Sequence, residues 1–133
     1  MRAIEVAAGI LIDPENRILL AQRSNDKPFP LQWEFPGGKL IKSETSKNAL
    51  NRELKEELDI IVKNPKFLTH IEHDYGSIMV RIDFFIVYSW LGQVINNENQ
   101  ILKWFKYDQL ININLLEADI PIVEELKFFL RQY

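Results

Sequence analysis

The sequence contains no cysteine. This absence excludes disulfide bridges, thiolate metal sites and a cysteine nucleophile, and it fits a reducing compartment, so we expect a cytoplasmic protein. The start of the chain also lacks a long hydrophobic run. Its apolar stretch, from Val6 to Ile12, is too short to cross a membrane and lacks the layout of a signal peptide. We therefore expect no membrane partner.

An excess of positive charge is missing as well. The 16 Lys and Arg residues are outnumbered by 19 Asp and Glu residues, which gives a net charge of −3 at pH 7. Nucleic-acid polymers are held mainly through their phosphates and need a basic surface. The composition therefore argues against long DNA or RNA as a partner and favours a small nucleotide that carries its own metal ion.

The composition indicates one well-packed domain. Of the 133 residues 47 % are hydrophobic, among them 8 Phe, 4 Tyr and 3 Trp, which is enough to build a core without metal or disulfide cross-links. No repeat, low-complexity tract or Gly/Ser-rich linker divides the chain. We predict a single domain over residues 1–133 and expect a monomer, with a dimer as the alternative.

Hydrophobic periodicity and turn residues predict both strands and helices. The first two strands are joined by the turn-forming sequence DPEN and are predicted to pair as a hairpin, and two later strands bracket Gly76 and Ser77 in the same way. The predicted strands are residues 3–12, 17–22, 31–35, 66–75, 79–90 and 101–105, and the predicted helices are 44–58, capped by Ser43, and 119–131. This mixture predicts an α+β fold in which helices cover a sheet.

The helix predicted over residues 44–58 carries a stripe of acids. Glu53, Glu56 and Glu57 are spaced i, i+3 and i+4, which places the three carboxylates on one face, beside the leucines that pack on the sheet. Like charges so close repel one another unless a cation neutralises them, and hard oxygen ligands in this number suit Mg²⁺ or Mn²⁺. Taken alone, the stripe also fits an ordinary solvated helix face on which Arg52 pairs with Glu56.

The spacing around the stripe favours the metal. From Gly38 the sequence reads G-x5-E-x7-R-E-L-x-E-E, with the first glutamate at Glu44. Six fixed polar or glycine positions match by chance with a probability on the order of 10⁻⁷ per register. Together with the preceding WEFPGGKL, this segment resembles the Nudix box of the Nudix hydrolases, covering residues 38–60. It departs from the box at Asp59, where the pattern has glycine, so we expect the helix end to differ.

The resemblance implies both a fold and a metal site. Nudix hydrolases are α/β/α sandwiches with a mixed sheet, and they cleave phosphoanhydride bonds with Mg²⁺, for which Mn²⁺ can substitute. The metal ligands implied for this chain are Gly37, Glu53, Glu56, Glu57 and Glu98. Gly37 would contribute its carbonyl oxygen from a turn at Gly37 and Gly38 that brings the backbone close to metal and phosphate. An ordinary tight turn before a helix is the alternative for these glycines.

The similarity extends over most of the chain to the MutT-like branch of the family. The segments AAGILID, ILLAQR, WEFPGGK, NENQILKW and LLEADIP occur in that order in one register. The branch hydrolyses nucleoside triphosphates, above all 8-oxo-dGTP, to the monophosphate and pyrophosphate. The resemblance therefore implies a nucleoside triphosphate as the small-molecule partner, and a role in nucleotide metabolism that protects DNA replication and repair from damaged nucleotides.

The same resemblance implies substrate contacts by Arg23, Lys39 and Asp119. The aromatic rings of Phe35, Tyr75 and Trp33 are candidates to stack on the base. Asp119 stands where the branch places its base-reading residue, which is asparagine in the best-known form. An ionised carboxylate accepts both N1–H and the 2-amino group of guanine or 8-oxoguanine, whereas cytosine offers it only the 4-amino group. The structural alternatives are a surface charge for Arg23, core packing for the aromatic rings and a helix N-cap for Asp119.

The implied chemistry is hydrolysis by water at the β-phosphorus. Glu53 and Glu98 are both candidates for the general base, Arg52 is expected to orient Glu53, and Glu44 is assigned a supporting role. Two rivals remain: a pyrophosphohydrolase for (d)CTP or 5-methyl-dCTP, and a non-catalytic nucleotide-binding Nudix domain. A non-catalytic domain could lose its metal glutamates without penalty, yet all are retained here.

Overall fold

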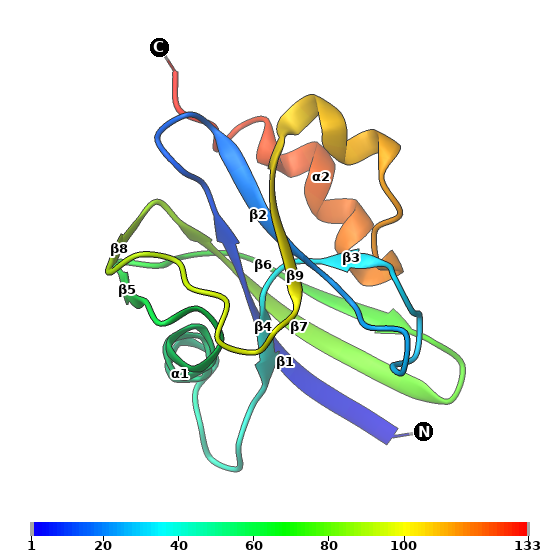
Figure 1. Cartoon of the computed structure of the whole chain (residues 1–133). Coiled ribbons are helices and arrows are strands. Elements are labelled where there is room, and N and C mark those ends of the chain that lie inside the picture. The colour runs from blue at the N-terminus through cyan, green and yellow to red at the C-terminus, as the bar shows by residue number, and fades with distance from the viewer. Residues whose placement is uncertain (1, 133) are drawn as a thin grey trace.

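The computed structural model describes residues 2–132 of the chain. The strands are β1 (Arg2–Leu11), β2 (Arg17–Gln22), β3 (Trp33–Glu34), β4 (Gly37–Lys39), β5 (Ile61–Lys63), β6 (Lys66–Asp74), β7 (Ile78–Val87), β8 (Ser89–Leu91) and β9 (Ile101–Lys106). The helices are α1 (Ser46–Leu58) and α2 (Ile120–Leu126), with the short 3-10 helices η1 (Tyr107–Asn112) and η2 (Glu117–Asp119). The predicted α+β fold is confirmed (Figure 1).

A mixed four-stranded sheet in the order β4-β1-β7-β6 forms the centre of the fold. β1 runs parallel to β7 along its whole length, while β4 pairs antiparallel with β1 and β6 antiparallel with β7. A second sheet, β3-β2-β9, and the two-stranded pair β5-β8 complete the structure. Because β1 has a neighbour on each side and is covered on both faces, its second half is apolar without interruption.

The two α-helices cover opposite faces of the central sheet. Side chains alternate along β1, so Ala7 and Leu11 pack in one cluster with the leucines of α1, whereas Ala8 and Ile10 pack in another with Ile122 of α2. Figure 1 shows α1, seen nearly end-on, well separated from α2. This is the α/β/α layering expected from the resemblance.

The predicted hairpin of residues 3–12 and 17–22 is wrong. Both strands form, but β1 belongs to the central sheet and β2 pairs with β3 and β9. Only a bridge between Ile12 and Ile18, together with the bond from the Asp13 N–H to the Arg17 carbonyl, joins the two strands. The partner of β1 is distant in sequence, and local alternation of side chains cannot reveal such a partner. The other hairpin, β6 with β7, is confirmed.

Helix α1 begins later than predicted and ends in the conformation typical of glycine. Its N-cap is Thr45, whose hydroxyl accepts from the Asn48 N–H at 3.1 Å, while Ser43 lies before the helix with a φ of 67°. Asp59 at the other end adopts the left-handed conformation, with φ 58° and ψ 37°, and donates its N–H to the Lys55 carbonyl. The expected change at the helix end is therefore not seen, because Asp59 tolerates the conformation.

The predicted helix 119–131 is shorter in the structure, where α2 ends at Leu126. Beyond it the chain turns back toward β7 and β8, and the Tyr88 hydroxyl donates to the Phe129 carbonyl at 2.6 Å. These contacts replace the next helical turns. None of the helices in the described part of the chain has the length and apolar character needed to span a membrane.

Two predicted strands are also interrupted. The segment 31–35 contributes only β3, because Leu31 has a φ of 64° and cannot continue a strand. The segment 79–90 divides at Tyr88 into β7 and β8, which belong to different sheets. A period-two pattern of side chains reports neither the backbone turn at Leu31 nor the change of sheet at Tyr88.

Candidate active site

Two glycines of β4 bring the backbone against its neighbours. The predicted turn at Gly37 and Gly38 is instead a short strand paired with Ala7 and Ala8 of β1. A Cβ added at Gly37 would lie 2.1 Å from the carbonyl oxygen of Ala7, and one added at Gly38 would lie 2.3 Å from the Cδ of Glu53. Only glycine fits at Gly37, where the β1 backbone blocks a side chain, whereas a side chain at Gly38 would displace the Glu53 carboxylate.

Arg52 connects the start of the Nudix-like segment to its acidic stripe. Its Nε and NH2 donate to the two carboxylate oxygens of Glu44 at 2.9 Å each, and its NH1 donates to Glu53 at 3.0 Å. A further bond of 3.0 Å joins NH2 to the Lys39 carbonyl, and Glu56 is 3.5 Å away. The Arg52 hydrogen bonds, joined by the Ile41 N–H, lower the pKa of Glu44 to about 2. Arg52 therefore fixes Glu53 in place.

Glu57 is the buried member of the acidic stripe. Only 9 % of the residue is exposed, whereas 54 % of the Glu56 side chain is. Burial raises the pKa of Glu57 to about 8, and the negative charges of Glu53, Glu98 and Glu34 act in the same direction. Four carboxylates from three parts of the chain therefore influence one another electrostatically.

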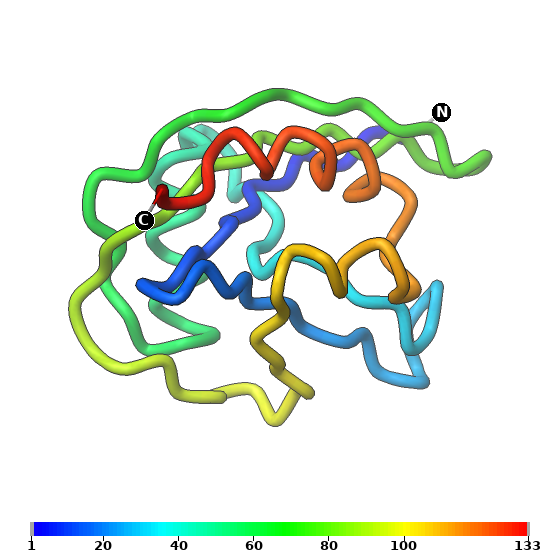
Figure 2. The backbone as a smooth tube through the Cα atoms, turned by 90° about the horizontal axis from the view of Figure 1, so that it is seen from above, coloured from blue at the N-terminus to red at the C-terminus, as the bar shows by residue number. Residues whose placement is uncertain are grey.

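The loop between β8 and β9 is tied to the end of α1. The Asn97 N–H donates to the Glu57 carbonyl at 3.0 Å, its side-chain amide donates to the Glu56 carbonyl at 3.3 Å, and the Ile95 N–H donates to Leu58. Figure 2 shows this loop, in yellow, on the side of the molecule away from the orange-red α2. The bonds satisfy the last carbonyls of the helix and carry the neighbouring Glu98 to the acidic stripe.

These residues fit a divalent metal ion. Within residues 2–132 no three carboxylate or imidazole groups already enclose a position for one. The donors are nevertheless of the hard oxygen type that Mg²⁺ and Mn²⁺ prefer. Burial, together with the like charges nearby, raises the pKa of Glu57, and a bound cation would offset both costs of its ionisation. Glu56 and Glu98 are exposed, so both can turn toward Glu57.

Asp119 is buried beside this acidic group. It is 3 % exposed, and its Oδ2 accepts from the Phe35 N–H at 3.2 Å. Although the residue precedes α2, its side chain makes no capping bond, so the alternative of a helix N-cap is not realised. Burial is the main cause that raises the pKa of Asp119, and the nearby Glu34 carboxylate raises it further.

Arg23 is close enough for its charge to act on Asp119, but its guanidinium is bonded to other partners. Its NH1 donates to Glu34 at 2.8 Å, and its Nε donates to the Pro28 carbonyl at 2.8 Å. The side chains of both members of the ion pair are mostly buried, with 19 % and 27 % exposed. Arg23 is thus held at the predicted substrate side, where Glu34 partly neutralises its charge.

The predicted aromatic contacts have different structural settings. The Phe35 ring is in the core, edge-on to Phe84 at 6.0 Å, so what Phe35 offers the site is its backbone N–H rather than a stacking face. Tyr75 accepts the Ala118 N–H on its hydroxyl at 2.9 Å, and its ring contacts Phe29 at 4.8 Å. Tyr75 therefore holds the segment that precedes Asp119.

The sequence matches the NUDIX domain family over residues 3–126. The chain belongs to the Nudix hydrolase family. Nudix hydrolases generally use divalent metal ions and act on small nucleotides, which agrees with the oxygen donors gathered around Glu57.

Named relatives narrow the branch of this Nudix hydrolase. It is 34 % identical to an 8-oxo-dGTP diphosphatase of Haemophilus influenzae over 125 residues, which are 94 % of this chain and 92 % of the relative. It is 33 % identical to a CTP pyrophosphohydrolase of Escherichia coli over 124 residues, 93 % and 91 % of the two chains. A solved structure from work on MutT of Aliivibrio salmonicida and Vibrio cholerae superposes with a TM-score of 0.80 at 33 % identity, covering 93 % of this chain and 96 % of that one.

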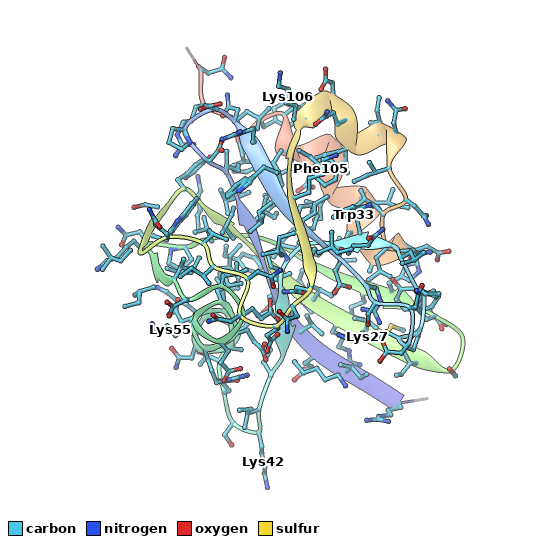
Figure 3. The ribbon with its side chains drawn as sticks, in the orientation of Figure 1. Lys27, Trp33, Lys42, Lys55, Phe105 and Lys106 are labelled. Atoms are coloured by element: carbon cyan, nitrogen blue, oxygen red, sulfur yellow. The ribbon has the colours of Figure 1, made fainter. Side chains whose placement is uncertain are left out.

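Lys39 and Lys42 of this Nudix hydrolase form no ion pair with the glutamates of the acidic stripe within the described residues. Lys39, expected to approach the phosphates, is exposed and borders an open cavity of about 380 Å³ that Arg2 and Arg81 also line. Figure 3 shows Lys42 at the tip of the loop before α1, pointing away from the body of the protein. To meet a phosphate held at the acidic stripe, the Lys39 side chain would have to turn away from this cavity.

Two functional candidates were missed by sequence reasoning. Glu34 pairs with Arg23 and influences both Glu57 and Asp119. The sequence signal for Glu34 was its place in the strand, where successive side chains point to opposite faces. The Trp33 ring packs edge-on against Phe105, so Glu34 points to the other side (Figure 3). Asn97 was the second omission. A polar loop gives no local sign that its backbone will cap a helix.

Proposed function

We propose that this Nudix pyrophosphohydrolase hydrolyses 8-oxo-dGTP to 8-oxo-dGMP and pyrophosphate, which removes a mutagenic nucleotide before DNA replication. The observation that carries the proposal is the proximity of two different groups. Glu34 acts electrostatically on both Glu57 of the acidic stripe and the buried Asp119. A nucleotide could therefore place its phosphates at the stripe and its base at Asp119. The 8-oxo-dGTP diphosphatase relative supports the choice of base.

The acidic stripe would hold the metal ions of the reaction, with Mg²⁺ as the expected cofactor. The proposed ligands are Glu53, Glu56, Glu57, Glu98 and the Gly37 carbonyl. When bound, divalent ions neutralise triphosphate charge and lower the pKa of water. Gly38 contributes by its lack of a side chain, which lets the Glu53 carboxylate lie against β4. Burial favours the neutral form of Glu57, but a bound cation would stabilise the carboxylate, so Glu57 would lose its proton when the metal binds.

Arg52 would act as a positioning residue and leave proton transfer to a glutamate. Its guanidinium is occupied by Glu44, Glu53 and the Lys39 carbonyl, so it has little to offer a phosphate. Glu53 is held rigidly by this contact, whereas Glu98 lies on an exposed loop. Both remain candidates for the general base that accepts a proton from the attacking water.

A pyrophosphohydrolase for (d)CTP is the second candidate. It is favoured by the carboxyl group of Asp119, which stands where the best-known MutT-like form has an amide, and by the CTP pyrophosphohydrolase relative. The metal and phosphate side would be the same for both substrates. Only the contacts made to the base by Asp119 and its neighbours would differ.

A substrate panel tests the proposal directly. Release of pyrophosphate from 8-oxo-dGTP, dGTP, dCTP, 5-methyl-dCTP and a nucleoside diphosphate sugar would be measured with Mg²⁺ and again with excess EDTA. We expect the highest kcat/KM with 8-oxo-dGTP and no turnover in EDTA. A clear preference for 5-methyl-dCTP would transfer the assignment to the second candidate, and cleavage of the sugar substrate alone would overturn both.

A further inference from the structure

The surroundings of Asp119 contain no cation bonded to its carboxyl group. Within the described residues, its one hydrogen-bond donor is the Phe35 N–H. Arg23, which follows β2, is bonded to Glu34 and to a backbone carbonyl instead. Asp119 is thus a buried acid whose nearest basic side chain serves another carboxylate.

Burial and the Glu34 carboxylate raise the pKa of Asp119 and outweigh the Phe35 N–H and the Arg23 charge, which lower it. Glu34 approaches from β3 as a second carboxylate, and Tyr75 from the end of β6 uses its hydroxyl to accept the Ala118 N–H. Glu117, on the same 3-10 helix as Asp119, pairs with His73 at 2.9 Å. An ionised carboxylate that is buried with one amide donor and a like charge nearby is strongly destabilised relative to its neutral form.

We propose that Asp119 reads the base as a neutral carboxylic acid, presenting one hydrogen-bond donor and one acceptor. Oδ2, which already accepts the Phe35 N–H, is the carbonyl oxygen and keeps a second lone pair for the base. Oδ1 carries the proton and is the donor. The inference rests on the proposed function only in placing the base at Asp119, and it replaces the ionised double acceptor predicted from the sequence.

The neutral acid selects bases differently from the carboxylate. On its O6/N7 edge, 8-oxoguanine offers an acceptor beside a donor, because oxidation places a hydrogen on N7, and the N3/N4 edge of cytosine offers the same pair. Unmodified guanine has two acceptors at O6 and N7. An ionised Asp119 would instead favour N1–H and the 2-amino group, which guanine and 8-oxoguanine share. At the O6/N7 edge the neutral acid can make both hydrogen bonds to the oxidised base but not to the normal one, whereas the O6/N1–H pair, which both bases share, gives no such discrimination.

The protonation state can be measured without any substrate. Carboxyl-carbon NMR of full-length protein labelled at aspartate would identify the Asp119 signal by its loss in Asp119→Asn. We expect the chemical shift of a protonated carboxyl group at pH 7, moving to the ionised value only at higher pH. A signal already at the ionised position at pH 7 would overturn the inference.

Kinetics test the consequence for the base. At pH 7 the ratio of kcat/KM for the preferred triphosphate to that for dGTP should stay within about threefold of wild type in Asp119→Asn, since an amide also has one donor and one acceptor. The ratio should fall about tenfold or more in Asp119→Ala. Asp108→Asn, the same change at an exposed position, serves as the control. If Asp119→Asn loses as much preference as Asp119→Ala, the neutral acid is wrong.

The two proposals fail in different ways. If 8-oxo-dGTP is cleaved no faster than dGTP, the proposed function fails, while the Asp119 carboxyl signal still decides its protonation. If 5-methyl-dCTP is the preferred substrate, the same kinetic ratio is measured with it, because cytosine requires the donor too. Thermal unfolding of each variant would show whether a lost preference reflects a lost fold.

Discussion

The proposed phosphate side and the proposed base side of this site are built in different ways. The phosphate side comes mainly from one continuous segment, in which Arg52 joins Glu44 to Glu53 and Gly38 accommodates the Glu53 carboxylate. The base side gathers Arg23, Phe35, Tyr75 and Asp119 from four separate parts of the chain, which hydrogen bonds such as those from the Phe35 N–H to Asp119 and from the Ala118 N–H to Tyr75 bring together. The proposed metal ligands therefore come mainly from local sequence, whereas the proposed base contacts are brought together by the tertiary structure.

This difference predicts how substitutions will divide. A change on the phosphate side should lower kcat for every nucleotide, because each substrate needs the same metal ions. A change on the base side should alter KM and the preference between bases, with little effect on kcat.

The largest effect is expected from Glu53→Gln. The substitution removes a proposed metal ligand and one candidate for the general base while keeping the shape of the side chain, so kcat should fall roughly 10³-fold with all triphosphates. Initial rates at saturating Mg²⁺ would measure it. Glu124→Gln makes the same change at an exposed position of α2 and should leave kcat unaltered. Unchanged hydrolysis in Glu53→Gln would instead favour the non-catalytic Nudix domain.

Much of the phosphate side could be predicted from the sequence because its contacts are local. Helical spacing alone places Glu53, Glu56 and Glu57 on one face, and the motif adds Arg52. What escaped prediction there was the strand formed by the two glycines, since β4 exists only by pairing with a distant strand.

The base side could be predicted only as a set of positions. The resemblance identified Arg23 and Asp119, but the partner of Arg23 and the burial of Asp119 depend on how β2, β3 and η2 come together. The protonation of a carboxyl group follows from that assembly rather than from the residue type. The same reasoning explains why the Phe35 ring was expected at the base and lies in the core instead.

The next largest effect concerns the stability of the metal-free protein. In the unfolded chain Glu57 loses its proton near pH 4.5, whereas burial and nearby carboxylates keep the folded group protonated up to about pH 8. The unfolded state therefore binds fewer protons in this window, and the free energy of unfolding should fall as pH rises, by at most about 1.4 kcal/mol per pH unit. Urea unfolding in EDTA between pH 5 and 8 would measure it.

Two comparisons sharpen that experiment. Glu57→Gln removes the titrating group, so its stability should depend less on pH than that of the wild type. Saturating Mg²⁺ should restore stability most at pH 8, where the carboxylate is available to bind it. Equal slopes for wild type and Glu57→Gln would show that Glu57 does not carry a raised pKa.

A smaller effect is expected from Arg52→Lys. Lysine keeps the positive charge but cannot reproduce the fork that binds Glu44 through two nitrogens while a third holds Glu53. The Glu53 carboxylate would lose its fixed orientation, so kcat should fall about 10- to 100-fold while KM changes little. Steady-state kinetics would separate the two constants. A rise in KM alone would place Arg52 on the substrate instead.

The smallest effect is expected on the base side, from Tyr75→Phe. The change removes the oxygen that accepts the Ala118 N–H, a bond that fixes the segment leading to Asp119, and such a bond contributes about 1 kcal/mol. KM for the preferred triphosphate should rise about fivefold with kcat retained, and Tyr107→Phe, the same change in η1, should leave both unaltered. If kcat falls instead, with KM constant, the base side reaches into the chemistry and the division between the two sides does not hold.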